Sequence, residues 1–130
     1  MIYTINNNKT LEITYTSNGE LAAHTCCIAH RSNSQLEIID LFATQDYGNM
    51  GFEDMLLEEV LGYAYEHDFT SVVVTIGPEP FNPKPYLSEA QCIAWYQAYG
   101  FECVPSIFAN SRMEYKLPTM ENICGSVNYG

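Results

Sequence analysis

The stretch that decides the fold is Ser88–Phe101, which reads SEAQCIAWYQAYGF. It opens with a capping box, because the Ser88 hydroxyl can accept a hydrogen bond from the amide three residues on and the Gln91 side chain can reach back. Good helix formers follow, and Gly100 supplies the left-handed residue that often ends a helix. The stretch therefore predicts a helix over Ser88–Tyr99 that is followed at once by a strand.

The rest of the chain divides into strands and one further helix. Alternating apolar and polar residues, or runs of β-branched residues, predict strands, and apolar residues three and four apart predict a helix. We expect strands at Met1–Ile5, Lys9–Thr16, Leu21–His30, Leu36–Thr44, Ser71–Ile76, Phe101–Ile107 and Ser111–Leu117, and the helix at Phe52–His67. The central strand–helix–strand unit implies a right-handed crossover and a locally parallel pair. The fold class is therefore α+β, a mixed and mostly antiparallel sheet with a central β-α-β unit, in one domain (1–117) before a tail (118–130).

Composition and cysteine usage narrow the class of protein. A chain of 130 residues that is 47% hydrophobic can bury the core of one domain. No apolar run approaches the roughly 20 residues that a membrane helix needs, and the N-terminus lacks the features of a signal peptide. The five cysteines form no Cys-x-x-Cys pair, which favours free thiols in a reducing cytosol and no metal site. We therefore expect a cytoplasmic protein that does not enter a membrane.

The charge of the chain indicates the kind of partner. Sixteen acidic residues stand against five basic ones, which gives a net charge of −11. No basic residue lies between Arg31 and Lys84, and most of the acidic residues fall in that gap. Such a field repels nucleic acid and anionic membranes, and it favours a cationic amine substrate or a basic protein. The alternative is a solvated acidic helix face of a protein from an acidic proteome.

The helix–Gly–Phe element resembles the late helix of the GNAT superfamily of N-acetyltransferases, whose pattern is roughly A-x-x-x-Y-x-x-x-G-F. The resemblance implies an acyl-CoA N-acyltransferase-like fold and acetyl-CoA as the co-substrate. It places Tyr96 at the acetyl-transfer tyrosine, which would protonate the departing CoA thiolate. The ordinary tyrosine pKa of about 10 suits that role. The alternative for Tyr96 is a tyrosine that packs on the sheet.

A second resemblance lies in Asp40–Leu57, DLFATQDYGNMGFEDMLL, which is similar to the family's cofactor segment, roughly V-x-P-E-Y-R-G-K-G-I-G-x-x-L-L. In that arrangement a splayed strand end binds the pantetheine arm, and a glycine-rich turn aims helix amides at the pyrophosphate. The resemblance implies cofactor contacts from Phe42, Ala43, Thr44, Gly48, Asn49, Met50, Gly51 and Phe52.

Four positions depart from the family pattern. Gly48 stands where an Arg or Gln is usual, and Met50 stands where a Lys is common. Glu53 occupies the last small-residue position, and its carboxylate would repel a diphosphate by about 1 kcal/mol or more. Glu89 lies where the family often has an Asn that touches the cofactor. These departures favour a second class of function, a catalytically degenerate protein that binds a basic protein partner.

Two carboxylates on the Leu36–Thr44 strand could deprotonate an acceptor amine, directly or through water. They are Glu37 and Asp40, and in a regular strand they point to opposite faces, so only one can reach the site. The alternative for each is a solvent-facing acid. His24 lies on the same strand face as Cys26, which leaves a cysteine-based hydrolase as a third option.

The main hypothesis is therefore an acetyl-CoA-dependent N-acetyltransferase that acts by direct transfer on an amine, either a polyamine-like molecule or a protein amino group. The alternative is the acidic binding protein. An exposed final strand could also pair across the axis of a homodimer.

Overall fold

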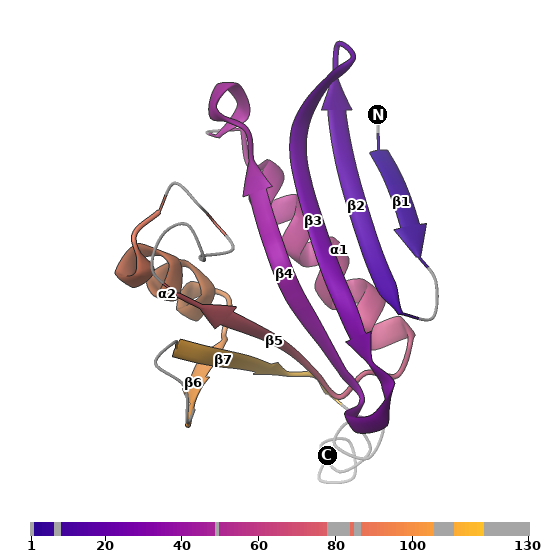
Figure 1. Ribbon diagram of the computed structural model, residues 1–130, viewed down its shortest axis with the longest axis vertical. Helices are drawn as coiled ribbons and strands as arrows, with labels where there is room; N and C mark the ends of the chain where they lie inside the picture. The colour runs from indigo at the N-terminus through magenta and orange to yellow at the C-terminus, as the bar shows by residue number, and fades with distance from the viewer. Residues whose placement is uncertain are drawn as a thin grey trace, which may run out of the picture.

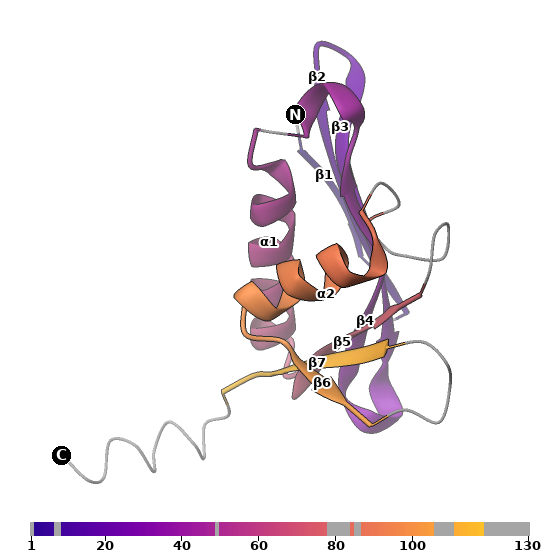
Figure 2. The ribbon, with the colours of Figure 1, turned by 90° about the vertical axis from the view of Figure 1, so that its left-hand side faces the viewer.

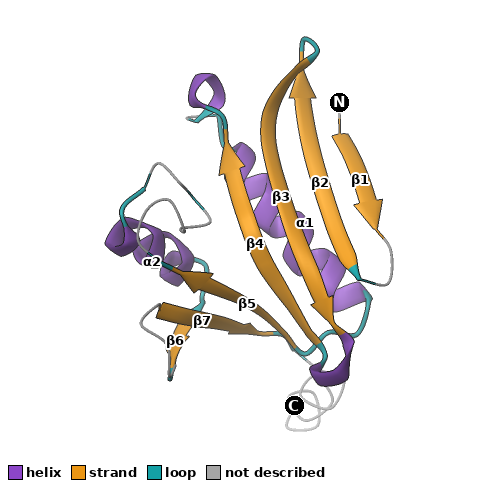
Figure 3. Ribbon diagram, viewed as in Figure 1, coloured by secondary structure: helices purple, strands orange, loops and turns teal. Residues whose placement is uncertain are grey.

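The computed structural model describes residues 2–6, 9–48, 50–77, 84, 87–105 and 111–118. Along these residues the strands are β1 (Ile2–Asn6), β2 (Thr10–Ser17), β3 (Glu20–His30), β4 (Gln35–Ala43), β5 (Ser71–Ile76), β6 (Glu102–Val104) and β7 (Ser111–Lys116), and the helices are α1 (Phe52–Glu66) and α2 (Glu89–Ala98). They form one sheet in the order β1-β2-β3-β4-β5-β7-β6 (Figures 1 and 3). Only the β4–β5 pair among them is parallel. The α+β class and the central β-α-β unit are confirmed.

Both helices bury their apolar sides against the same face of the sheet, and Figure 2 shows α1 lying along it. α1 contributes Leu56, Leu57, Val60 and Ala64, all with no exposed surface. Full burial of each leucine stabilises the fold by about 1.5–3 kcal/mol. The sheet face that points away from the helices, here called the polar face, is covered by no helix of the described residues. Neither α1 nor α2 is long and apolar enough to cross a membrane.

The end of the chain differs from the expectation. The final strand β7 lies between β5 and β6, so it is not an edge strand. The idea that an exposed final strand pairs across a dimer is therefore wrong for this strand, and the homodimer itself stays a prediction. β6 spans three residues instead of the expected Phe101–Ile107, and residues 106–110 lie outside the described residues, as does the tail after Pro118.

A β-bulge in β4 decides which side chains share a face. Cys27 pairs with Ile38 and Cys26 pairs with Asp40, so Ile39 is an extra residue on β4. Because a bulge inserts one residue, it reverses the alternation of side chains beyond it. Glu37 and Asp40 therefore both lie on the polar face, and the expectation that they point to opposite faces is wrong.

The capping box and the glycine stop of α2 are confirmed. The Gln91 amide donates to the Ser88 hydroxyl oxygen at 3.2 Å, and the Ser88 amide donates to the Gln91 side chain at 3.0 Å. Gly100 has a φ of 98°, in the region that favours glycine. These local signals fix where α2 starts and how the chain turns into β6.

Replacing Gly100 by alanine is expected to lower the free energy of unfolding by about 1–2 kcal/mol. The φ is positive, and a Cβ there would lie 3.3 Å from the Tyr115 ring. Gly62 in α1 is a matched control, because a Cβ there meets no atom within 4 Å. Gly62→Ala should raise the free energy of unfolding by about 0.5–1 kcal/mol. Urea denaturation measures both changes, and two changes of the same sign would contradict this account.

Candidate functional site

The site begins where the two parallel strands separate. β4 and β5 pair from Gln35–Ile38 with Ser71–Val74, and no pairing between them continues beyond Ile38. β4 runs on to Ala43, and Figure 1 shows the two strands diverging toward their carboxyl ends. The bulge at Ile39 lies at this point, where bulges bend a strand away from its neighbour. Ligands of parallel sheets bind outside the carboxyl ends of strands that part in this way.

The end of β4 is held by β3. The Thr44 amide donates to the Ala22 carbonyl at 2.9 Å, and the Thr44 hydroxyl donates to the Leu21 carbonyl at 3.1 Å. Ala43 is buried on the side of α1, whereas Phe42 is half-buried on the polar face. Of the expected cofactor residues, Phe42 and Ala43 therefore stand on the part of β4 that has left β5, and Thr44 follows directly after the strand.

The N-terminus of α1 follows directly. Its N-cap is Gly51, with a φ of 76°, and no side chain caps the helix there. A hollow of about 300 Å³ opens at this end of α1, lined by Gly48, Gly51, Glu53, Asp54, Lys84, Leu87 and Trp95. Phe52 does not line it, because its ring packs 5.8 Å from the Tyr15 ring. Met50 is 62% exposed, and Asn49 lies outside the described residues.

Lys84 changes the electrostatics of this hollow. Its side chain is 1% exposed and forms an ion pair with Glu53, which is 12% exposed. The ammonium also lies 4.0 Å from the centre of the Trp95 ring, a cation–π contact. Burial lowers the pKa of Lys84 to about 8. Glu53 is therefore not the isolated charge that we expected at this helix end, because a buried cation neutralises it.

Tyr96 lies in the core of the domain. Its side chain has no exposed surface, and its ring packs 4.9 Å from Trp95 and 5.1 Å from Phe101, both edge to face. Its catalytic role stays a prediction, since packing alone would also explain this position. At the start of α2, Glu89 accepts a hydrogen bond from the Ser111 hydroxyl at 3.3 Å.

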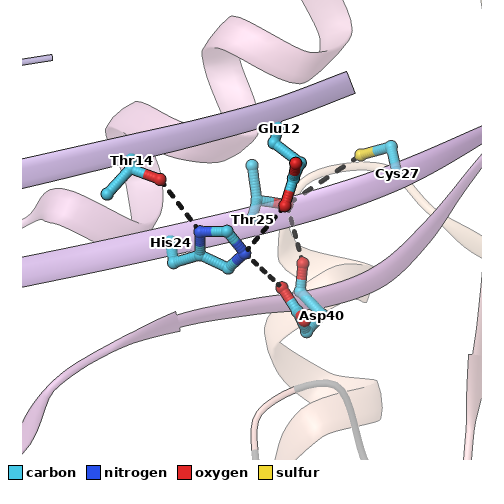
Figure 4. A network of polar contacts seen from close by, with 6 residues as sticks. All are labelled: Glu12, Thr14, His24, Thr25, Cys27 and Asp40. Atoms are coloured by element: carbon cyan, nitrogen blue, oxygen red, sulfur yellow. Dashed lines mark hydrogen bonds and ion pairs between the residues drawn. The ribbon is translucent and has the colours of Figure 1, made fainter. Parts of the chain in front are cut away.

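A cluster of polar side chains lies on the polar face, across β2, β3 and β4 (Figure 4). The His24 Nε2 is 3.7 Å from Asp40 Oδ1 and 3.9 Å from Glu12 Oε1. The other ring nitrogen, Nδ1, is 3.0 Å from the Thr14 hydroxyl. Burial raises the pKa of Asp40, and the nearby His24 partly opposes that rise. We call Glu12, His24 and Asp40 the carboxylate–histidine cluster.

The two predicted bases are placed differently along β4. Asp40 lies past the last β4–β5 pair, in the part of the strand that diverges. Glu37 lies within the paired part, opposite Val73, and its carboxylate is 2.8 Å from His30. Asp40 is therefore the better placed base for a reaction at the strand ends.

No family model matches the sequence, and no curated protein matches it. The fold does match solved structures. The PaiA N-acetyltransferase from Thermoplasma acidophilum, in complex with coenzyme A, matches with a TM-score of 0.68 at 13% identity, over 84% of this chain and 62% of that one. A GNAT-family acetyltransferase from Staphylococcus aureus matches at 0.68 and 14%, over 86% and 70%. An aminoglycoside 6'-N-acetyltransferase complexed with coenzyme A matches at 0.70 and 10%, over 87% and 76%.

The chain has the GNAT fold. At these identities the likeness shows the fold alone. The chain also spans only 62% of the first of these proteins. The ligand and the transferred group of this GNAT-fold protein therefore depend on its own residues.

Two features of this GNAT-fold site escaped the sequence reasoning. Lys84 was visible only as the one basic residue between Arg31 and Arg112. The role of His24 depends on the register of three strands, which places it opposite Thr14 and Phe42. Without the fold, the sequence does not show which side chains Lys84 and His24 contact.

The cysteine alternative loses support. Burial raises the pKa of the Cys26 thiol, and the neighbouring Asp40 and Glu12 raise it further. A nucleophilic cysteine needs the opposite shift, because the thiolate is the reactive form. Among the residues that the structure describes, no group of histidines, cysteines and carboxylates could hold a metal ion.

Proposed function

We propose that the protein transfers the acetyl group of acetyl-CoA to an amine. The observation that carries the proposal is the divergence of β4 from β5 beyond Ile38, followed by the open N-terminus of α1. The same fold occurs in solved N-acetyltransferases, two of them in complex with coenzyme A.

The residues present fit the parts of acetyl-CoA. Backbone groups of β4 beyond Ile38 do not pair with β5, which leaves them able to bind the amides of a pantetheine arm. The first-turn amides of α1 and the helix dipole favour a phosphate group. Lys84 lines the same hollow and provides the cation that Gly48 and Met50 do not. A diphosphate would compete with Glu53 for it.

The proposed reaction uses Asp40, which lies on the diverging part of β4, and Tyr96, in the role that the family resemblance implies. The acceptor ammonium first gives one proton to Asp40. The amine nitrogen then attacks the thioester carbonyl carbon, a C–N bond forms, and the C–S bond breaks. The thiolate takes a proton from the Tyr96 phenol, as the family resemblance implies. The acylated nitrogen loses its extra proton, which returns through solvent to the Tyr96 phenolate, and Asp40 releases its proton to solvent. The products are the amide and free CoA.

One observation favours the alternative, an acidic protein that binds a basic partner without catalysis. The Glu53–Lys84 pair occupies the hollow where the diphosphate would bind. Exchanging one partner of a buried ion pair is costly unless the new partner is as well placed. The same pair therefore decides between the two functions.

Calorimetric titration of acetyl-CoA into the native protein tests the proposal. We expect micromolar binding, and binding about five- to tenfold tighter in Glu53→Gln, because the variant removes the carboxylate that competes for Lys84 and repels the diphosphate. Glu66→Gln makes the same change of charge at the last residue of α1 and should bind like the native protein.

The outcomes separate the two functions. Binding by the native protein that Glu66→Gln leaves unchanged supports the enzyme. Binding that appears only in Glu53→Gln means that the ion pair closes the native site. An absence of binding in both proteins overturns the proposal, and the basic-partner alternative then stands.

A further inference from the structure

We propose that the polar face of β2, β3 and β4 is a docking surface for a basic amphipathic helix of a partner protein. The surface holds four apolar residues, here called the apolar strip: Leu21 and Ile28 on β3, and Ile39 and Phe42 on β4. Figure 1 shows α1 behind β3 and β4, so the strip faces the viewer. The inference does not rest on the proposed function, because the surface would bind such a helix with or without acetyl-CoA.

The first argument is the exposure of the apolar strip. Leu21, Ile28 and Ile39 are 43%, 37% and 44% exposed, and they are half of the exposed large hydrophobic residues in the described part of the chain. Ile28 pairs with Glu37, which places it on the polar face, and the exposure of Ile39 at the bulge excludes the side of α1. No helix of the described residues covers the strip. Gathered apolar surface of this kind is typical of interaction sites.

The second argument is the shape of the apolar strip. Leu21 and Ile28 lie near the two ends of β3, about 23 Å apart at about 3.3 Å per residue. Phe42 pairs with His24, and Ile39 lies at the bulge, so both fall between these ends on the neighbouring strand. A helix rises about 1.5 Å per residue, so about 15 residues span this length. A narrow strip of this length matches the apolar side of an amphipathic helix, on which apolar residues recur every three or four positions.

The third argument is the charge along the strip. Glu12 on β2, and Glu37 and Asp40 on β4, lie on the same face, whereas β2, β3 and β4 contain no lysine or arginine. Within the described part of the chain, these carboxylates form ion pairs only with His24 and His30, which must be protonated to carry a charge. A helix with lysines or arginines beside its apolar side complements this pattern.

A second copy of this chain fits the strip less well. A symmetric contact through this face would place the carboxylates of each copy against the same acidic surface of the other, and each copy has a net charge of −11. Nucleic acid and anionic membranes are repelled for the same reason. A basic partner is the occupant whose charge opposes that of the surface.

The experiment titrates two peptides into the native protein without acetyl-CoA. The probe is a peptide of about 16 residues that repeats Leu-Lys-Lys-Leu, so that its leucines share one side of a helix. The control peptide alternates leucine and lysine, which gives the same composition and charge but no apolar side in a helix. We expect calorimetry to show micromolar binding of the probe and at least about tenfold weaker binding of the control. Equal affinity for both would show attraction by charge alone and would overturn the surface.

Variants locate the surface on the protein. Ile39→Ser removes an exposed apolar side chain from the strip and should weaken binding of the probe at least about fivefold. Met55→Ser is the matched control, because Met55 lies on α1, on the other side of the sheet, and is 45% exposed. Glu37→Gln and Glu58→Gln form a second pair, the first along the strip and the second on the exposed side of α1. Only the first variant of each pair should weaken binding.

The outcomes decide the assignment. Selective losses in Ile39→Ser and Glu37→Gln, in variants that urea denaturation shows to be folded, support the surface. Equal losses in Met55→Ser, or no binding of the probe, contradict it. A native dimer in light scattering that Ile39→Ser dissociates also contradicts it, because a second copy then covers the strip. Since acetyl-CoA is absent from the titration, none of these outcomes bears on the proposed function.

Discussion

Replacing Glu53 by alanine is expected to lower the free energy of unfolding by about 3–5 kcal/mol at neutral pH, because a buried ammonium loses the carboxylate of its ion pair. The ammonium that remains belongs to Lys84, whose side chain is 1% exposed. The Trp95 ring stays in contact and offsets part of the loss. Lys84→Met should cost less, since it leaves a carboxylate at a helix N-terminus, where the dipole favours it. Urea denaturation of both variants gives the comparison.

The effect of pH on the free energy of unfolding follows from the titration of Lys84. Burial lowers the pKa of Lys84 to about 8, whereas a lysine in the unfolded chain titrates near about 10.4. The unfolded chain therefore binds more protons between these values, and the free energy of unfolding rises with pH in that window. The free energy of unfolding of Glu53→Ala should be lower than that of the double variant Glu53→Ala/Lys84→Met at pH 7. This difference should shrink as the pH rises to 10. A difference independent of pH would show that no buried ammonium causes it.

The sequence predicts those parts of the fold that depend on residues close together in the chain. The capping box joins Ser88 and Gln91, three residues apart, and Gly100 meets a local need for positive φ. The β-α-β unit follows from the order of the elements and the handedness of crossovers. Each of these signals needs no knowledge of a distant partner.

The parts that the sequence does not predict depend on tertiary pairing. Ile39 is an extra residue only in relation to its neighbours Cys26 and Cys27 on β3. The residue types in β4 give no indication of the bulge. One inserted residue was enough to reverse the expected side of Asp40. The Lys84–Glu53 contact joins residues 31 positions apart, so the charge of Glu53 could be read from the sequence while its neutralisation could not.

Replacing Tyr96 by phenylalanine is expected to lower kcat for acetyl transfer by about 10²–10⁴-fold, the usual contribution of a general acid. The free energy of unfolding should change little, because the ring that packs on Trp95 and Phe101 is kept. Binding of acetyl-CoA should also be unchanged. Initial rates with 1,4-diaminobutane and with a lysine-containing peptide as acceptors measure kcat, and calorimetry measures binding.

Tyr15→Phe is the matched control, because Tyr15 is a second buried tyrosine, 3% exposed, whose ring packs against Phe52. Both variants remove one buried hydroxyl and keep one ring, so a loss that comes from packing would appear in both. A loss of kcat in Tyr96→Phe alone, with native stability and native acetyl-CoA binding, assigns the phenol to the chemical step. Native kcat in Tyr96→Phe would make Tyr96 a packing residue, and the thiolate would then take its proton from water.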